Sequence, residues 1–182
     1  MLAPTAPRIL LCTLNARYSH ASLGLRYLLA NVGELAAQTA IREFTINDQP
    51  GVIAERLLAE KPAIIGFGVY IWNLRETTRV AQIIRAVAPE VKLVIGGPEV
   101  SYEYEGVPLV TLCDVLITGE ADLTLPAVLA DLLANRPVAK VVRSPKPDPA
   151  SLTLPYALYE DRDLRERIIY VEASRGCPYT CE

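Results

Sequence analysis

The sequence predicts an α/β protein built on a doubly wound parallel sheet, in which helices cover both faces of five strands. Short runs of consecutive apolar and β-branched residues, typical of strands buried on both faces, alternate with longer segments of helical periodicity. The stretches between these runs are too long for hairpins, so each is expected to be a crossover between parallel strands. With 182 residues, 51% of them hydrophobic, the chain can bury one domain of about 100 to 150 residues and leave a remainder.

The five predicted strands occupy residues 8–14, 41–46, 63–69, 92–97 and 114–119. Helices are predicted at residues 22–38, 50–61, 73–90 and 121–137. Residues 100–113 have the weakest helical pattern because Gly106 and Pro108 interrupt it. We expect a further short strand within residues 138–144.

Polar residues at the helix starts are expected to cap them. Ser22 is placed to cap the first helix, and Asn73 with Glu76 three residues later forms a variant of the capping box. Asp122 or Thr124 is expected near the cap of the last helix. The helix that follows Asn73 is expected to bury Val80, Ile83, Ile84 and Val87.

The composition divides the chain into three parts. Residues 1–143 are expected to form the α/β domain, and residues 144–166, which begin with four prolines in twelve residues, a poorly packed linker. Residues 167–174 form a new apolar run that predicts a buried strand, and this run leads directly into Cys177 and Cys181. Residues 167–182 are therefore expected to begin a second domain.

Charge and hydropathy exclude several classes of function. The net charge of −3 comes from 18 basic and 21 acidic residues without a basic run, so no nucleic-acid partner is expected. No apolar stretch reaches the roughly 18 residues that cross a bilayer, so no membrane partner is expected. Without an export signal the protein is expected in the cytoplasm, with reduced thiols. Cys12 and Cys113 lie in apolar runs and are expected to be core residues.

The carboxyl ends of the predicted strands form the candidate ligand site, since ligands of open parallel sheets bind at that edge. Glycines end three of the strands there, which lets backbone approach a bulky ligand. His20 is the only histidine in the chain, and a lone histidine in a polar loop is more often solvated than a ligand. The candidate binding residues are Asn15, Arg17, Tyr18, Ser19, His20, Gly68, Val69, Tyr70, Trp72, Gly96, Gly97, Pro98, Glu99, Gly119 and Glu120.

Common nucleotide-binding motifs are absent from the sequence. There is no GxxxxGK[ST], and no GxGxxG follows the first predicted strand. The segment after the third strand, GFGVYIWN, lacks the aspartate that a receiver domain would carry there. A phosphate-cradling first loop and receiver chemistry are therefore both disfavoured.

The spacing of two glycine-containing segments resembles the cobalamin-binding domain family. Gly96 and Gly97 match the family's G-G after the fourth strand, while residues 68–70 read Gly-Val-Tyr where the family has S-x-L. The family's D-x-H-x-x-G loop is absent, because His20 lacks the aspartate and the correctly spaced glycine. The resemblance implies cobalamin as cofactor and a flavodoxin-like, Rossmann-like three-layer sandwich with strand order 2-1-3-4-5. Because the D-x-H-x-x-G loop is absent, no histidine ligand to cobalt is expected.

The terminal RGCPYTCE resembles the opening of the radical S-adenosylmethionine (SAM) motif CxxxCxxC. Cys177 and Cys181 would be two of its three metal ligands, and the third position would fall after Glu182, so the chain is expected to be truncated inside the motif. NARYSHASLGLRYL, VIGGPEV, ITGEAD and EASRGCPYTCE together resemble the amino-terminal part of cobalamin-dependent radical SAM enzymes, such as the anaerobic magnesium-protoporphyrin monomethyl ester cyclase and methyltransferases.

This second resemblance implies that the full-length protein is an enzyme of methyl-transfer or cyclase-type radical chemistry. It would hold a [4Fe-4S] cluster and S-adenosylmethionine, act on a small-molecule substrate, and pair this domain with a radical SAM barrel of the same polypeptide. The 182 residues alone would bind cobalamin without catalysis. The alternatives are a flavodoxin-like module that binds a nucleotide, a flavin or a protein without corrin, and a CxxxC that is a zinc half-site or a chance pattern.

Overall fold

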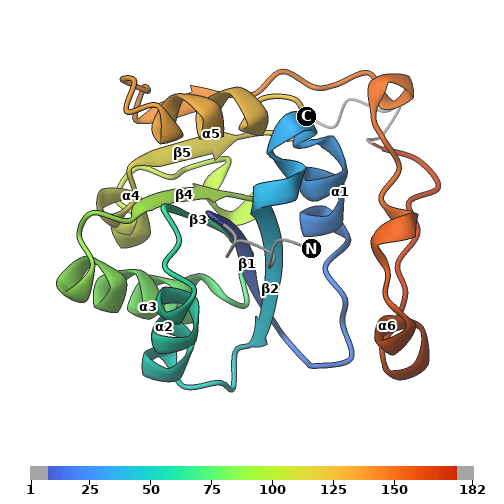
Figure 1. Ribbon diagram of the computed structural model, residues 1–182, viewed down its shortest axis with the longest axis horizontal. Coiled ribbons are helices and arrows are strands. Elements are labelled where there is room, and N and C mark those ends of the chain that lie inside the picture. Colours follow the sequence, from blue (N-terminus) through green and yellow to red (C-terminus); the bar gives the residue numbers. More distant parts are fainter. Residues whose placement is uncertain (1–7, 176–182) are drawn as a thin grey trace, which may run out of the picture.

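The computed structural model describes residues 8–175 and has a single parallel sheet (Figure 1). Its strands run in the order β2-β1-β3-β4-β5-β6, which confirms the predicted order 2-1-3-4-5 and adds the short sixth strand expected within residues 138–144. The strands are β1 (Ile9–Asn15), β2 (Thr39–Thr45), β3 (Ile64–Gly68), β4 (Lys92–Gly96), β5 (Val115–Thr118) and β6 (Val141–Arg143).

Helices cover both faces of the sheet (Figure 1). On one face lie α2 (Pro50–Ala59), α3 (Leu74–Val87) and α4 (Pro108–Leu112). On the other lie α1 (Leu23–Asn31), the 3₁₀ helix η1 (Gly33–Gln38) and α5 (Leu125–Leu133). Because strand side chains alternate between faces, Leu10 and Cys12 pack under α2 and α3, whereas Leu11 packs under α1 and α5. No helix within residues 8–175 is long and apolar enough to cross a membrane.

Both cysteines of the domain are core residues, as predicted. Cys12 and Cys113 are buried and free. Burial raises the pKa of the Cys12 thiol far above its ordinary value of 9.0, and the nearby Glu43 carboxylate adds to this. A buried protonated thiol is unreactive, so Cys12 packs as a small apolar side chain.

The helix caps agree with the prediction at Ser22 and Thr124 but not at Asn73. The Ser22 hydroxyl accepts a hydrogen bond from the backbone N–H of Leu25 at 3.3 Å and caps α1 as expected. Asn73 occupies the N-cap position of α3, but the predicted capping bond is wrong, because its buried side chain bonds to Tyr70 and to the ends of β1 and β3 instead of to the first turn of the helix. Thr124 occupies the N-cap position of α5 without a side-chain cap bond.

Two further details of the helices differ from the sequence predictions. The first helix is shorter than expected: α1 ends at Asn31, and the chain passes through Gly33, at φ +64°, into the 3₁₀ helix. Val87, in the last turn of α3, is 65% exposed, so its predicted burial is wrong. Val80 and Ile84 are buried as predicted, whereas Ile83 is only partly buried and packs at the edge of the core.

The segment after the sheet is more closely attached to the domain than the sequence suggests. Residues 149–166 form the 3₁₀ helices η3 (Pro149–Ser151) and η4 (Tyr156–Leu158) and then α6 (Asp161–Glu166), and the segment lies beside α1 (Figure 1). Asp163 is buried, so the expectation of poor packing is wrong there.

The predicted buried strand at residues 167–174 is also not found. The segment makes a single parallel bridge, between Ile168 and His20, and Val171 is 72% exposed.

A buried cluster of charges holds this segment in place. Arg26 of α1 pairs with Glu43 of β2 at 3.1 Å and with Asp163 at 2.6 Å, and Arg167 pairs with the same two carboxylates. Burial raises the pKa of Glu43, but hydrogen bonds from Ser22 and Asn15 and the charge of Arg26 outweigh this and hold it below its ordinary value. The cluster balances two cations against two carboxylates, which makes their shared burial tolerable.

Candidate functional site

A cavity of about 440 Å³ lies between the sheet and the helices α1 and α5 and opens toward the carboxyl ends of the strands. Its walls come from three sources: one face of the sheet, the two helices, and the strand-end loops together with the segment near residue 175. The lining residues used below are Leu11, Gly24, Leu25, Tyr27, Gly66, Gly68, Tyr70, Val94, Gly96, Gly97, Pro98, Ile117, Gly119, Glu120, Asp122, Glu172 and Arg175.

Three glycines form the floor of this cavity. Gly66 and Gly68 lie on β3 two residues apart, so they share one face of the sheet, and Gly68 pairs in register with Gly96 of β4. Phe67 and Ile95, between them, belong to the core on the opposite face. Where other strands of the sheet place Val or Ile, these positions place no Cβ, and the absent side chains leave the cavity open.

Gly97 has a different role from these three. Its φ is +120°, and a Cβ there would lie 2.4 Å from the carbonyl oxygen of Val69 and 2.9 Å from its nitrogen. The Val69 N–H also donates to the Gly96 carbonyl at 2.8 Å, so the loops after β3 and β4 touch through their backbones. A side chain at Gly97 would therefore collide with the backbone of Val69, so this glycine is required for the contact between the two loops.

Asn73, which sequence reasoning assigned to a helix cap, shapes the loop after β3. Its Oδ1 accepts from the N–H of Tyr70 at 2.9 Å, and its Nδ2 donates to the carbonyls of Leu14 and Gly68 at 3.1 Å each. This positions Tyr70, whose ring stacks on Trp72 at a centroid distance of 4.6 Å and an angle of 7°. Burial raises the pKa of Tyr70, so its hydroxyl remains a hydrogen-bond donor at neutral pH.

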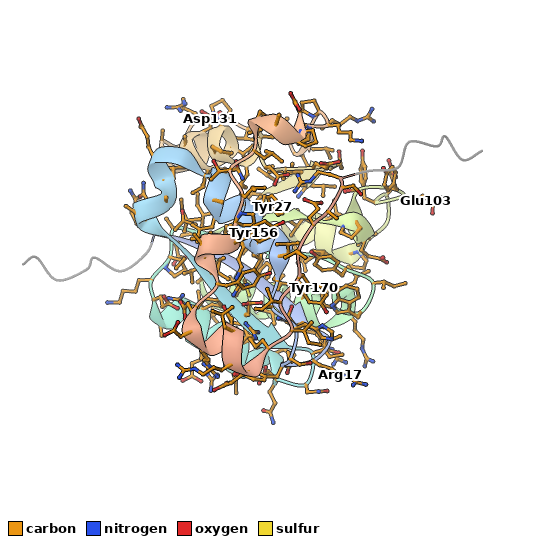
Figure 2. The ribbon with its side chains drawn as sticks, turned by 90° about the vertical axis from the view of Figure 1, so that its right-hand side faces the viewer. Arg17, Tyr27, Glu103, Asp131, Tyr156 and Tyr170 are labelled. Carbon is orange, nitrogen blue, oxygen red and sulfur yellow. The ribbon has the colours of Figure 1, made fainter. Side chains whose placement is uncertain are left out.

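The predicted residues of the first loop lie outside the cavity. Asn15 is buried and donates to the His20 carbonyl at 2.8 Å, so it holds the loop together. The Tyr18 hydroxyl donates to Glu166 at 2.7 Å, and the Ser19 carbonyl accepts from the N–H of Ile168 at 2.7 Å. Arg17 is exposed, and Figure 2 shows its side chain at the margin of the molecule. This loop therefore contacts the C-terminal segment.

His20 has a defined partner in the same segment. Its Nδ1 is hydrogen-bonded to the hydroxyl of Tyr170, and the two rings stack with centroids 5.9 Å apart. The side chain belongs to no cluster of potential metal ligands within residues 8–175. The structure thus gives His20 a structural partner, in line with the more common role of a lone loop histidine.

The structure gathers about half of the predicted site residues around the cavity. Those that line it are Gly68, Tyr70, Gly96, Gly97, Pro98, Gly119 and Glu120. Those that do not are Asn15, Arg17, Tyr18, Ser19, His20, Val69, Trp72 and Glu99. Gly66 and Asp122 also line the cavity; both belong to strand-end segments that the sequence singled out, although neither is among the candidate binding residues. Sequence reasoning missed Tyr27 and Arg175, for which the sequence carries no signal.

Charged residues close the entrance of the cavity. The Arg175 guanidinium pairs with Asp122 at 2.8 Å and Glu120 at 3.3 Å, both after β5, and with Glu172 at 3.1 Å. It also lies over the Tyr27 ring, 4.4 Å from the centroid. Burial lowers the pKa of Arg175, but the carboxylates of Glu172 and Asp122 raise it by more. The pKa therefore lies above its ordinary value, and the guanidinium is always charged.

Tyrosines fix the position of this C-terminal segment against α1. The Tyr156 hydroxyl accepts a hydrogen bond from the N–H of Glu172 at 3.1 Å, and the Tyr159 hydroxyl donates to the carbonyl of Tyr170 at 3.0 Å. In Figure 2, Tyr156 lies next to Tyr27, and Tyr170 lies farther along the segment. Cys177 and Cys181, the predicted metal ligands, lie outside the described residues.

A doubly wound α/β domain with a glycine-floored cavity at the carboxyl edge of its sheet is a cofactor-binding domain of the flavodoxin-like kind. The family follows from the sequence match: residues 9–129 match the model of the B12 binding domain, and the chain belongs to that family.

Two curated relatives are methyltransferases. The chain is 29% identical to "Cobalamin-dependent radical SAM methyltransferase TokK" of Streptomyces tokunonensis, over 66% of this chain and 21% of that protein. It is 28% identical to the "2-(S-pantetheinyl)-carbapenam-3-carboxylate methyltransferase" of Streptantibioticus cattleyicolor, with the same coverage. The chain therefore spans about a fifth of the length of these relatives.

Solved structures share the fold. The radical S-adenosylmethionine methyltransferase TsrM from Kitasatospora setae, with cobalamin and a [4Fe-4S] cluster bound, aligns with a TM-score of 0.59 at 16% identity, over 72% of this chain and 26% of that one. A cobalamin-binding protein from Desulfitobacterium hafniense DCB-2 aligns with a TM-score of 0.52 at 19% identity, over 70% of this chain and 59% of that one.

Proposed function

We propose that this chain binds cobalamin with the corrin ring over the strand-end loops and the nucleotide tail in the cavity between the sheet and the helices α1 and α5. The observation that carries the proposal is the floor of Gly66, Gly68 and Gly96, where ordinary strand residues would fill the space with side chains. An elongated tail that ends in a flat aromatic base fits a cleft of about 440 Å³ whose floor and walls are largely apolar.

Different residues of the chain would contribute to cobalamin binding in different ways. Leu11, Val94 and Ile117 line the inner part of the cavity and exclude water from it. The stacked Tyr70 and Trp72 present a flat aromatic surface beside the opening, and Trp72 is 46% exposed there. When bound, cobalamin supplies methyl-transfer or one-electron chemistry, and the share of this domain is to hold and orient it.

The lower face of the cobalt is proposed to be free of a histidine ligand. His20 is held by Tyr170 through a hydrogen bond and ring stacking. It is also absent from the cavity lining, and the loop lacks the D-x-H-x-x-G pattern. Water or an aromatic side chain such as Tyr70 or Trp72 would then face the metal.

We further propose a role for the domain in a larger protein. The proteins similar to it include radical SAM methyltransferases of which it spans about a fifth to a quarter. We propose that residues 144–166 connect the domain to a radical SAM barrel of the same polypeptide, which performs methyl-transfer or cyclase-type chemistry on a small molecule in the cytoplasm. Cys177 and Cys181 would be two ligands of its [4Fe-4S] cluster, beside which S-adenosylmethionine binds.

Reconstitution tests cobalamin binding directly. The purified 182-residue chain is incubated with hydroxocobalamin, desalted, and examined by visible absorption, with flavin mononucleotide in a parallel incubation. We expect corrin absorption at about one equivalent per chain and no retained flavin. Retention of flavin without corrin would support instead the alternative of a flavodoxin-like module.

A further inference from the structure

Arg175 has a special place among the residues around the cavity, because it is the only cation among the lining residues that the structure describes. It comes from the C-terminal segment, outside residues 9–129 that match the B12 binding domain model. Its side chain is 12% exposed, so its charge lies largely within the protein at the entrance. The family match therefore does not account for it.

The hydrogen bonds of the guanidinium leave donor capacity on one nitrogen. Nη1 donates to Asp122 and Glu120, and Nε donates to Glu172. Nη2 lies 3.1 Å from a Glu172 oxygen as an ion pair but makes no hydrogen bond of good geometry within residues 8–175. A guanidinium has five N–H donors in a planar fork, which suits the oxygens of a phosphate.

Two of the three carboxylates around Arg175 are more exposed than the third. Asp122 is buried and close, whereas the Glu172 side chain is 26% exposed and that of Glu120, at 3.3 Å, is 34% exposed. Turning Glu172 or Glu120 into water costs less free energy than turning Asp122, because the first two side chains are already partly hydrated. An anion that enters the cavity can thus take the place of Glu172 or Glu120, while Asp122 keeps the guanidinium in position.

We infer that Arg175 recognises the phosphodiester of the cobalamin nucleotide tail and so selects complete cobalamin over corrinoids that lack this tail. The inference rests on the proposed function, since it assumes that the tail enters this cavity. Cobalamin carries one negatively charged phosphodiester between the corrin and the base, and Arg175 stands at the entrance through which this part would pass. Tyr27, under the guanidinium, keeps it oriented toward the cavity.

The test compares two corrinoids on three forms of the 182-residue chain. Dissociation constants for hydroxocobalamin and for cobinamide, which lacks the nucleotide and its phosphate, are measured by visible absorption for the unaltered chain, Arg175→Gln and Arg136→Gln. Arg136 is a matched control, since it pairs with Asp131 on the surface and does not line the cavity. Arg175→Lys, which keeps the charge but not the fork, is measured as well.

We expect Arg175→Gln to weaken cobalamin binding about tenfold to hundredfold, the range of one charge-assisted hydrogen bond, and to leave cobinamide binding within about twofold. The affinity of Arg175→Lys for cobalamin should lie between those of the unaltered chain and Arg175→Gln, and Arg136→Gln should bind cobalamin as tightly as the unaltered chain. Raising the salt concentration should weaken cobalamin binding to the unaltered chain and should have less effect on Arg175→Gln, since the phosphate would have lost its cationic partner.

The outcomes separate the inference from the function on which it rests. If Arg175→Gln weakens both corrinoids equally, or neither, Arg175 serves only to attach the segment and the inference is wrong. If the unaltered chain binds neither corrinoid, the proposed function fails and the inference fails with it. Thermal unfolding of each variant shows whether a loss of binding reflects a loss of fold.

Discussion

Replacing Gly68 by a larger residue tests the proposed cofactor site most directly. A Cβ at Gly68 would lie 3.6 Å from Leu25 Cδ2 and 3.7 Å from Thr13, which are ordinary van der Waals distances, and its φ is not in the left-handed region. Gly68→Ala should therefore fold with a change in stability of about 1 kcal/mol or less. In Gly68→Leu the longer side chain would reach into the space that Gly66, Gly68 and Gly96 leave open.

The expected loss of affinity follows from the area that the tail buries. An aromatic base comparable to a large aromatic side chain buries about 150 to 250 Å², worth about 4 to 6 kcal/mol at about 25 cal/mol per Å². Excluding it should weaken cobalamin binding about a thousandfold or more. Gly68→Ala should show a smaller loss, so the order of affinity is unaltered chain, Gly68→Ala, Gly68→Leu.

The assay is retention of hydroxocobalamin after desalting, followed by a titration at constant protein concentration. Gly51→Leu is the matched control, because a Cβ at Gly51 meets no atom within 4 Å and the residue lies on α2, on the other face of the sheet. Cobalamin binding by Gly68→Leu with the affinity of the unaltered chain, in a protein that unfolds at the same temperature, would show that the cavity does not receive the tail.

Three further predictions follow from the geometry. Gly97→Ala should lower the free energy of unfolding in urea by about 1 to 3 kcal/mol, since its Cβ would meet the Val69 carbonyl at 2.4 Å; an unchanged unfolding midpoint would contradict the close loop contact. His20→Ala should change the affinity for cobalamin less than about threefold, which corresponds to about 0.7 kcal/mol. Electron paramagnetic resonance of the reduced cofactor should show no nitrogen splitting from a histidine; splitting that is present in the unaltered chain and disappears in the variant would refute a histidine-free site. Arg26→Met should lower the free energy of unfolding by about 3 to 5 kcal/mol, because it leaves the buried carboxylates with one cation fewer. Arg79→Met, which removes a more exposed ion pair with Glu76, should lower it by less than about 1 kcal/mol; equal effects would contradict the buried cluster.

The same cluster predicts how stability depends on pH. The pKa values of Glu43 and Asp163 are lowered in the folded protein from their ordinary values of 4.5 and 3.8. Their contribution is therefore fully present above these values and is lost as the pH falls below them, because the unfolded state then binds more protons. Urea unfolding at a series of pH values between neutral and acid should show this loss, and Arg26→Met should reduce its size.

The sequence by itself predicted the parallel sheet and the edge of the candidate ligand site, and its resemblance to the cobalamin-binding family implied the strand order that the structure confirms. The apolar runs of the strands are continuous because a parallel sheet buried on both faces requires it, and this local pattern does not depend on distant contacts. Gly68, Gly96 and Gly97, which line the cavity, could be predicted because glycine at a strand end is visible in the sequence and the ends of parallel strands meet at one edge. The match to the B12 binding domain over residues 9–129 confirms the family that these glycines indicated.

Only the tertiary structure decided which of the loop residues form the site and what closes it. Tyr18, Ser19 and His20 lie at the same edge, but they turn toward the C-terminal segment, because Glu166, Ile168 and Tyr170 bring partners from about 150 positions away. Arg175 reaches the cavity for the same reason. Partners so distant in the chain leave no periodicity or spacing in the sequence, since the free energy of an ion pair depends on separation in space and on burial, which the fold alone sets.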